Sequence, residues 1–256
     1  MHPSLTFHVS ALAAALLLST PVSRAESAKE LITTGDIFAS TFKSEEALKY
    51  YLPALKMEPE NVPILLRIAR QYREWMTDTT TRKEQLRLGH LSLGYAERAA
   101  ALAPEDSEAQ LSTAISLGKM LPYQSSREQV DASPRIKVAV DKAIKLNPDN
   151  DIAWHVLGRW HQGLADVGRL KRSVGSLLFG ELPASTNEES VTCFEKAIAL
   201  DPLCLRHHIE LGITYAQMGR NAEARKAIEK GLAMPNLEKD DPESKVRGRE
   251  DLAKLP

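Results

Sequence analysis

Ser116 and Lys119 carry the S-x-x-K spacing of a serine nucleophile and its lysine base. In hydrolases that use this pair, S-D-N and K-T-G motifs accompany it, and the chain contains neither. It also lacks G-x-G-x-x-G, the P-loop pattern, H-E-x-x-H and G-x-S-x-G, which hold phosphates, a catalytic zinc or an acyl-enzyme nucleophile. Both residues fall inside an amphipathic segment, where such a spacing arises by chance. The sequence therefore predicts a protein without catalytic residues or catalytic activity.

The histidines do not form a metal-binding pattern within one helix. His155 and His161 are six residues apart, which separates their directions by about 240° on a helix, whereas a zinc-binding helix uses histidines four apart. His207 and His208 are adjacent and diverge by about 100°. We therefore expect no metal site and no cofactor.

Two cysteines, Cys193 and Cys204, could form one disulfide. The sequence places them on adjacent antiparallel helices that turn near Asp201 and Pro202, with Cys193 well before the turn and Cys204 just after it. Their offset along the helices then exceeds the ~4.4–6.8 Å that a disulfide allows between Cα atoms. We expect two buried or half-buried free thiols.

Basic side chains recur on one face of successive amphipathic segments. They are Arg70, Arg73, Lys119, His155, Arg159 and Arg206, with Lys171 and Arg172 in a longer segment nearby. The acidic residues on this face are fewer, namely Asp36, Glu74 and Glu108, so the basic residues modestly outnumber them. Because guanidinium groups make paired hydrogen bonds to carboxylates, we predict that this face binds another protein or peptide through an acidic or C-terminal segment. The alternative is a solvated charged face with stabilising ion pairs.

A six-residue pattern that occurs four times predicts the elements that position these side chains. The copies are residues 54–59, 99–104, 143–148 and 197–202, and each begins with alanine and ends with proline. Proline cannot continue a helix, and a new amphipathic segment follows each copy. The chain is thus expected to consist of stacked helix pairs, none of which can bury its apolar face alone.

The residues within these pairs match the tetratricopeptide repeat, a 34-residue helix–turn–helix. Gly35, Ala47 and Pro59 in one unit, and Gly158 and Phe194 in another, stand at the expected spacing. We predict an all-α solenoid of tetratricopeptide-like pairs with a C-terminal capping helix. The expected units are about 28–61, 62–106, 107–150, 151–204 and 205–235, and the expected cap is 243–255. The four prolines are 45, 44 and 54 residues apart, so the inner units should contain longer helices or loops.

Residues 1–25 resemble a secretory signal sequence. An apolar run from about Val9 to Leu18 is too short to span a bilayer, and Ser23 and Ala25 precede a cleavage point before Glu26. We therefore predict a secreted or periplasmic protein, 26–256, without membrane contact after cleavage. No Lys or Arg precedes the apolar run, so an uncleaved N-terminal anchor is the alternative.

The region from 152 to 202 resembles the regulator of microtubule dynamics family. The matching residues are 155–160, 171–172, 177–180, 183–186 and 194–197, and the basic pair before Leu-Phe in the long segment is the specific feature. The resemblance extends over about residues 45–235 and implies an all-α repeat fold, no catalysis and a protein partner. Because tubulin is absent outside the cytosol, we do not extend the resemblance to tubulin binding.

The balanced charge of the chain argues against nucleic acid as a partner. It has 256 residues, with 33 Lys and Arg against 34 Asp and Glu, so it lacks the basic excess of general nucleic-acid-binding proteins. We predict an exported, non-catalytic protein-binding scaffold. Three alternatives stay open: a self-assembling structural spacer, a membrane-anchored microtubule-associated regulator, and an enzyme whose site lies in the longer segments.

Overall fold

The computed structural model describes residues 26–166 and 183–256. Within these ranges the chain is helical and contains no strand, so the predicted all-α solenoid is confirmed. The predicted signal sequence, Lys171 and Arg172 lie outside the described residues. Across the described ranges, none of the helices combines the length and the apolar character needed to cross a membrane. The helices are α1 (Ala28–Ser40), α2 (Ser44–Met57), α3 (Val62–Asp78), α4 (Arg82–Leu102), α5 (Ser107–Met120), α6 (Ser126–Leu146), α7 (Asp151–Ala165), α9 (Asn187–Leu200), α10 (Leu205–Gln217), α11 (Asn221–Ala233) and α12 (Asp241–Lys254).

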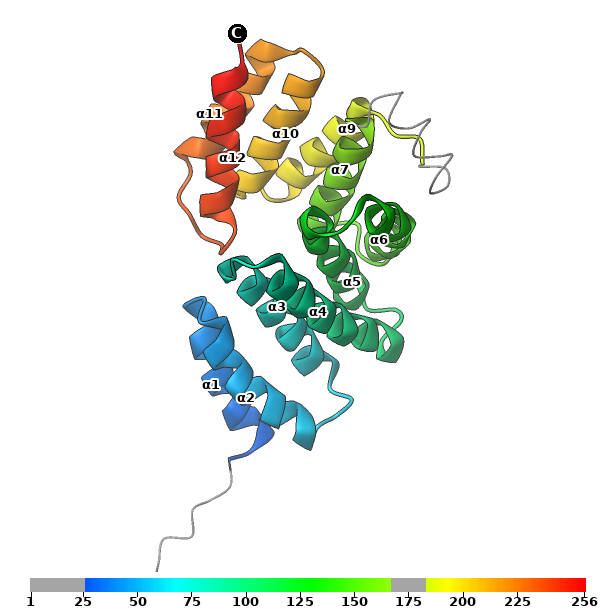
Figure 1. Cartoon of the computed structure of the whole chain (residues 1–256), viewed down its shortest axis with the longest axis vertical. Coiled ribbons are helices and arrows are strands. Elements are labelled where there is room, and N and C mark those ends of the chain that lie inside the picture. Colours follow the sequence, from blue (N-terminus) through cyan, green and yellow to red (C-terminus); the bar gives the residue numbers. More distant parts are fainter. Residues whose placement is uncertain (1–25, 167–182) are drawn as a thin grey trace, which may run out of the picture.

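The helices pack as consecutive antiparallel pairs along an arc (Figure 1). The pairs are α1 with α2, α3 with α4, α5 with α6, α7 with α9, and α10 with α11, and each pair also contacts the next one. Helix α12 packs against both α10 and α11. It lies on the inner, open side of the arc in Figure 1, together with the chain that precedes it.

The repeated six-residue pattern ends the second helix of each of the first four pairs. Helices α2, α4, α6 and α9 end at Met57, Leu102, Leu146 and Leu200, two residues before a proline. The alanine that begins each copy is fully buried, and its carbonyl accepts the last backbone N–H of the helix. A small buried side chain lets the next helix approach closely, while the proline prevents the helix from continuing. These two local effects set where each pair turns into the next.

Polar side chains begin the first helices of three consecutive pairs. Asn61, Asp106 and Asn150 each accept a hydrogen bond from a backbone N–H of the first turn of α3, α5 or α7. Such N-caps stabilise a helix by about 1 kcal/mol. The equivalent residue of α10 is Cys204, which makes no capping hydrogen bond within the described part of the chain.

Glycine and a large aromatic ring meet inside two of the pairs. A Cβ atom at Gly35 would lie 2.5 Å from the ring of Tyr51, and one at Gly158 would lie 2.9 Å from the ring of Phe194. Tyr51 and Phe194 are almost completely buried. The glycine therefore permits the close contact between the two helices of a pair that the repeat pattern predicted.

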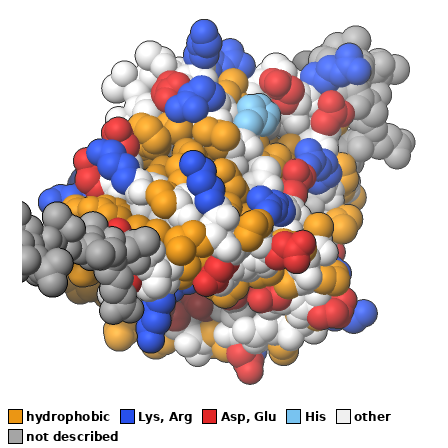
Figure 2. Space-filling view, turned by 90° about the horizontal axis from the view of Figure 1, so that it is seen from below, with side chains coloured by type: hydrophobic (Ala, Val, Ile, Leu, Met, Phe, Trp, Pro, Cys, Tyr) orange, Lys and Arg blue, Asp and Glu red, His pale blue; other side chains and the backbone are white. Residues whose placement is uncertain are grey.

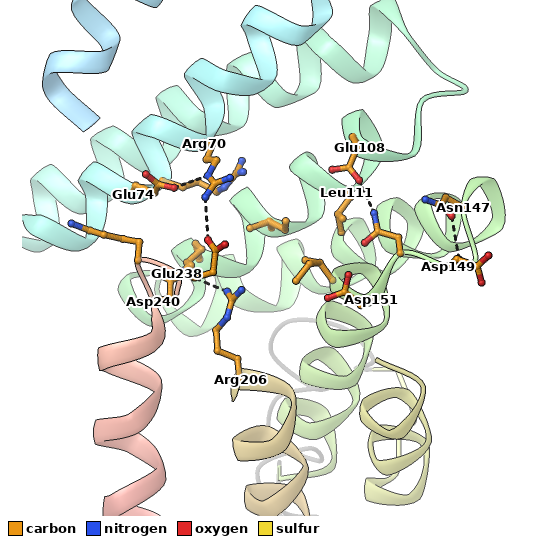
Figure 3. A pocket seen from close by; sticks show the side chains of 16 residues that line it. Arg70, Glu74, Glu108, Leu111, Asn147, Asp149, Asp151, Arg206, Glu238 and Asp240 are labelled. Atoms are coloured by element: carbon orange, nitrogen blue, oxygen red, sulfur yellow. Dashed lines mark hydrogen bonds and ion pairs between the residues drawn. The ribbon is translucent and has the colours of Figure 1, made fainter. Parts of the chain in front are cut away.

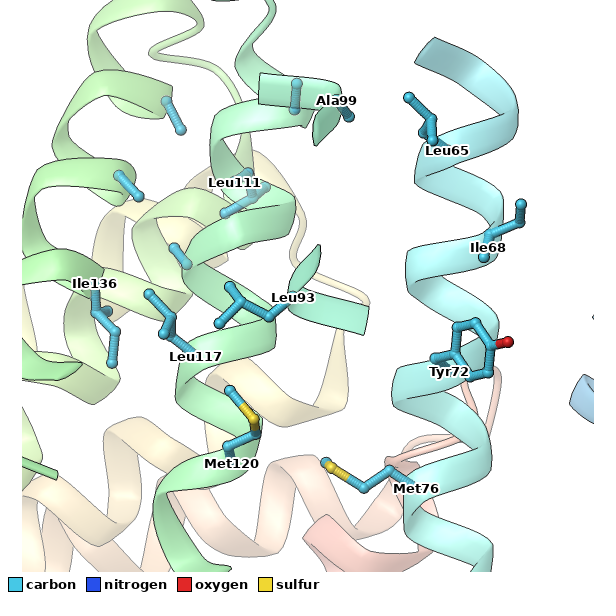
Figure 4. Close-up of a cluster of buried hydrophobic side chains, with 14 of the residues drawn as sticks. Leu65, Ile68, Tyr72, Met76, Leu93, Ala99, Leu111, Leu117, Met120 and Ile136 are labelled. Atoms are coloured by element: carbon cyan, nitrogen blue, oxygen red, sulfur yellow. The ribbon is translucent and has the colours of Figure 1, made fainter. Parts of the chain in front are cut away.

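The apolar core is continuous through most of the solenoid. One cluster of buried side chains extends from Ala28 in α1 to Cys193 in α9, and Figure 4 shows part of it between α3, α5 and their neighbours. The inner pairs also contain the long helices that the proline spacing predicted, because α4 and α6 have 21 residues each whereas α2 has 14. This core holds the first helices side by side and so presents their exposed faces to one another.

Candidate functional site

A pocket of about 520 Å³ lies on the inner side of the arc (Figure 3). Its walls come from α3, α5, the start of α7, the start of α10 and the chain between α11 and α12. Four of the predicted basic residues line it together, namely Arg70, Arg73, Lys119 and Arg206. First helices of three different pairs therefore contribute cations to one pocket.

The chain itself supplies the acidic partners of these cations. Residues 236–241, which we call the acidic segment, connect α11 to α12 and cross the pocket. Arg70 Nη2 lies 3.1 Å from Glu238 Oε2, and Lys119 Nζ lies 2.7 Å from Asp240 Oδ2. Cations of this face are thus paired with carboxylates of the same chain.

Arg206 holds the end of the acidic segment. Its guanidinium lies 3.8 Å from Asp240 Oδ2 and 3.4 Å from Asp241 Oδ1. Asp241 also accepts hydrogen bonds from the backbone N–H groups of Leu237 and Glu238, at 2.7 and 2.8 Å. The Asp241 carboxylate therefore fixes the backbone of the segment. In this conformation Glu238 and Asp240 point toward the pocket (Figure 3).

Electrostatics hold the paired groups in their charged forms. Burial alone would raise the pKa of Asp240, but Lys119, with Arg206 and Arg73, outweighs it and lowers that pKa below its usual value. Burial disfavours the charge of Arg70, yet Glu74 and Glu238 raise its pKa. The ion pairs of the acidic segment are consequently present at neutral pH.

Arg73 has a structural contact that its predicted role did not include. Its Nη1 donates to the hydroxyls of Ser112 and Ser116, at 3.0 and 3.1 Å. Burial lowers the pKa of Arg73 to about 10. Ser116 is fully buried, and its hydroxyl donates to the Ser112 carbonyl, whereas Lys119 pairs with Asp240. The S-x-x-K residues thus have separate partners.

His155 and Arg159 lie away from the residues that line the pocket, between α7 and α10. Arg159 Nη1 donates to Glu210 Oε2 at 2.6 Å, and Arg247 of α12 contacts the other oxygen of the same carboxylate. Burial and the nearby charge of Arg159 lower the pKa of Arg247 to about 9. Glu210, whose side chain is 1% exposed, therefore joins three helices.

A cluster of nitrogen, sulfur and oxygen ligands borders the pocket beside Asp151. The nearest ligand atoms of Asp151, Cys204 and His207 all lie within 4.8 Å of one another. His207 Nε2 is 2.9 Å from Asp151 Oδ2, and His207 Nδ1 is 2.9 Å from His155 Nδ1. Histidine spacing within one helix gave no sign of this cluster, because Asp151 and His207 are brought together by the packing of two pairs. The sequence did contain one signal for the cluster, the C-x-x-H spacing of Cys204 and His207 at the start of a helix.

Neighbouring groups set the charges of this cluster. Burial lowers the pKa of His155 well below its usual value, and the charge of His207 lowers it further. Burial disfavours a charged His207, but hydrogen bonds to Asp151 and Cys204 raise its pKa overall. Burial would raise the pKa of Cys204, yet the hydrogen bond to His207 lowers it. Both cysteines of the described chain are free thiols; Cys193 is buried and Cys204 half-buried.

The model of the family described as Regulator of microtubule dynamics protein 1-3 matches residues 31–256. The chain belongs to this family. Regulator of microtubule dynamics protein 1 of Mus musculus is 27% identical over 215 residues, covering 83% of this chain and 70% of that protein. Regulator of microtubule dynamics protein 2 of Rattus norvegicus is 24% identical over 183 residues, covering 71% of this chain and 44% of that protein. The chain thus spans less than half the length of the rat family member.

Two solved structures share the fold of the present chain. A thermophilic TPR protein from Thermus thermophilus superimposes with a TM-score of 0.62 at 17% identity, covering 89% of this chain and 100% of that one. The MamA protein superimposes with a TM-score of 0.50 at 18% identity, covering 86% of this chain and 94% of that one. At this identity the comparison establishes the tetratricopeptide-like solenoid.

Proposed function

We propose that this protein is a non-catalytic scaffold whose concave pocket binds an acidic segment of a partner protein. The observation that carries the proposal is the convergence of Arg70, Lys119 and Arg206, from three different helix pairs, on carboxylates of one short segment. A surface that binds the acidic segment of its own chain has the charges and spacing to bind a similar sequence from another protein.

The lining of the pocket favours a polypeptide over a small molecule. Its volume, about 520 Å³, is within the range of small-molecule sites, but those sites are mostly apolar with few polar groups. Here charged and amide side chains dominate, including Glu108, Asn147 and Asn150 opposite the acidic segment. Side-chain amides and guanidinium groups match the carbonyl, N–H and carboxylate groups of an extended acidic peptide.

Glu238, one of the carboxylates of the acidic segment, is held weakly enough to be exchanged. Arg70 and Glu238 are 54% and 48% exposed, and ion pairs at such sites contribute about 0.2–1 kcal/mol each. The more buried pair of Lys119 and Asp240 is 29% and 23% exposed. A partner segment with several carboxylates, present at high local concentration, can therefore compete with residues 236–241.

A peptide-binding experiment on the full chain tests the proposal. The probe is a labelled peptide with the sequence of residues 236–242, Asn-Leu-Glu-Lys-Asp-Asp-Pro, and binding is followed by fluorescence anisotropy at low salt. The double variant Glu238→Gln/Asp240→Asn removes the carboxylate charge that Lys119 contacts and one of the two carboxylate charges at Arg70 and at Arg206, which keep Glu74 and Asp241. We expect it to bind the probe at least about tenfold more tightly than the unaltered chain, which is a difference of about 1.4 kcal/mol.

Two further variants give this experiment its controls. Adding Lys119→Glu to the double variant should remove the gain. The double variant Glu46→Gln/Glu223→Gln changes the same net charge at exposed ion pairs on α2 and α11 and should bind the probe like the unaltered chain. Equal affinity of the pocket variant and this surface variant would reject the pocket as the binding site.

The absence of catalysis is part of the proposal and is supported by the contacts of the two residues with catalytic spacing. The residues of the S-x-x-K pattern have separate partners, since Ser116 is bonded among serines and Arg73 while Lys119 pairs with Asp240. Hydrolysis of activated esters by the purified chain, lost in Ser116→Ala, would contradict it.

Family membership favours one second candidate, a regulator that associates with microtubules. The named relatives are regulators of microtubule dynamics, and the chain covers 70% of the mouse protein but 44% of the rat one. Co-sedimentation with assembled microtubules tests this candidate. Retention of the chain in the pellet, reduced by the probe peptide, would identify the microtubule as the partner of the pocket.

Export is proposed from the sequence of residues 1–25. Cleavage after Ala25 would make Glu26 the first residue of the mature protein. Mass spectrometry of the protein isolated from its own cells distinguishes this product from a chain that keeps Met1. An intact N-terminus would support the anchored alternative and a cytosol-facing partner.

A further inference from the structure

We propose that Asp151, Cys204 and His207 bind a zinc-class divalent metal ion at the edge of the pocket. One carboxylate oxygen, one sulfur and one imidazole nitrogen lie within 4.8 Å of one another. They come from the starts of α7 and α10, two first helices that pack side by side. Its ligands differ from the cations that hold the acidic segment, so metal binding can be measured separately from peptide binding.

The identity of residue 204 is the first argument. The equivalent residues of three preceding pairs, Asn61, Asp106 and Asn150, cap their helices with a side-chain oxygen. Cys204 makes no capping hydrogen bond of the kind that those three residues make; its sulfur interacts with the side chain and the backbone N–H of His207. A thiol is not among the side chains preferred at this position. The cysteine does, however, supply a soft metal ligand next to an imidazole.

The ligand set and its geometry point to zinc. Zinc binds thiolate, imidazole and carboxylate at about 2.0–2.3 Å, with tetrahedral geometry, which places neighbouring ligand atoms about 3–4 Å apart. No two of the three atoms here are more than 4.8 Å apart, and His207 Nε2 is 2.9 Å from Asp151 Oδ2. A thiolate and a carboxylate also neutralise the two charges of the ion.

His155 is placed to orient the histidine ligand. Its Nδ1 lies 2.9 Å from His207 Nδ1, on the side of the ring opposite to Asp151. If His207 Nδ1 carries the hydrogen and donates it to His155, Nε2 is left free for the metal, which is the arrangement of metal-bound histidines in general.

Three protein ligands leave one coordination position of a tetrahedral ion. Asp151 lines the pocket, and its side chain is 26% exposed while that of His207 is 0% exposed. The remaining position therefore faces the pocket, where water or a carboxylate of a bound segment can occupy it. Sites with three protein ligands and one open position are accessible to exchange, unlike closed four-ligand sites.

Metal titration of the full reduced chain tests the site. The probes are Zn²⁺, followed by calorimetry, and Co²⁺, followed by its absorption spectrum. We expect one ion per chain and a thiolate-to-cobalt charge-transfer band that Zn²⁺ abolishes. The variant Cys204→Asn should lose the band and weaken zinc binding at least about 100-fold. Because asparagine caps the equivalent helices, this variant should melt at a higher temperature than the metal-free unaltered chain, which shows that it folds.

The chain offers matched controls for both key ligands. Cys193→Ala removes the other thiol, and His208→Gln removes the adjacent imidazole, whose Nε2 contacts the Pro202 carbonyl; both should keep the band and the affinity. His207→Gln should lose both. His155→Phe should keep the band but weaken binding by about 10–100-fold, as loss of an outer-sphere partner does. Absence of stoichiometric zinc binding, or binding that survives in Cys204→Asn, would overturn the proposal.

Discussion

Lys119 and Asp240 form an ion pair of 2.7 Å that connects the third helix pair to the chain just before the C-terminal helix. Between these residues lie α6, α7, α9, α10 and α11. The pair is less exposed than Arg70–Glu238, with exposed fractions of 29% and 23% against 54% and 48%. Together with the contacts of Arg206 to Asp240 and Asp241, it determines where residues 236–241 lie.

Reversing the charge of Lys119 should release the acidic segment. In Lys119→Glu, carboxylates face each other where an ion pair stood, so we expect faster amide hydrogen exchange in residues 236–241. The free energy of unfolding should fall by only about 1 kcal/mol, because partly exposed pairs contribute little. Lys49→Glu, which alters an exposed pair within α2, is the control. Unchanged exchange in Lys119→Glu would show that the pair does not hold the segment.

Acid should remove the contribution of Asp240 to stability. Its pKa is lowered in the folded chain, so its contribution is present above the usual value, about 4, and is lost as the pH falls through the folded pKa. Urea unfolding of the unaltered chain and Asp240→Asn, measured at pH 7 and near pH 3, gives the difference in unfolding free energy at each pH. That difference should shrink in acid. A difference that is constant with pH would mean that the carboxylate charge of Asp240 is not what stabilises the fold.

Removing the charge of Glu210 should be more costly than breaking the ion pair of Lys119 and Asp240. Its buried carboxylate contacts Arg159 and Arg247, and Glu210→Gln leaves two guanidinium groups facing each other. A fully buried charge left alone costs about 3–5 kcal/mol; both arginines are about 40% exposed, so we expect roughly 2 kcal/mol. Chemical denaturation measures it. In a chain that already carries Arg247→Met, Glu210→Gln should lower the free energy of unfolding by less. An equal decrease in both chains would argue that Glu210 and Arg247 do not interact energetically.

Two glycines in helices should respond in opposite directions to alanine. A Cβ at Gly212 would lie 2.9 Å from the backbone oxygen of Ala224, so Gly212→Ala must separate α10 from α11 and should cost about 1–3 kcal/mol. Around a Cβ at Gly94 no described atom lies within 4 Å, so Gly94→Ala should stabilise by about 0.5–1 kcal/mol. Thermal unfolding of both variants compares them. Similar melting temperatures would contradict the close packing of α10 and α11.

Local features of the sequence were sufficient to predict the fold. The alanine and proline of each six-residue pattern act within one turn of the chain, and the structure ends four helices at those positions. The glycine opposite a large ring, as in Gly158 with Phe194, is likewise a spacing property of one pair. Such signals need no knowledge of distant contacts.

The candidate site could be predicted only in part, because its contacts join distant pairs. Periodicity placed Arg70, Lys119 and Arg206 on first helices, but it contains no information on the path of residues 236–241. His155 and Arg159 were assigned to the same face, yet they pack against α10 through His207 and Glu210. Their roles in partner binding stay predictions. The proximity of Asp151 to Cys204 follows from the angle between neighbouring pairs, which the repeat pattern does not specify.

Figure 2 shows the solenoid from below, with basic and acidic side chains interspersed over the visible face. This mixture agrees with the near balance of 33 Lys and Arg against 34 Asp and Glu. A face of mixed sign has no strong net field with which to attract a polyanion. The proposed binding of an acidic partner segment therefore depends on the pocket cations rather than on the overall charge.

The path of the acidic segment has a mechanical consequence for the whole solenoid. In most repeat proteins each unit contacts only its neighbours, so the terminal units can fray while the centre stays folded. Here residues 236–241 connect the last pair to α3 and α5. Separation of the last pair must therefore also break contacts near the middle of the chain. Stretching the arc or melting its C-terminal end is resisted by both regions together.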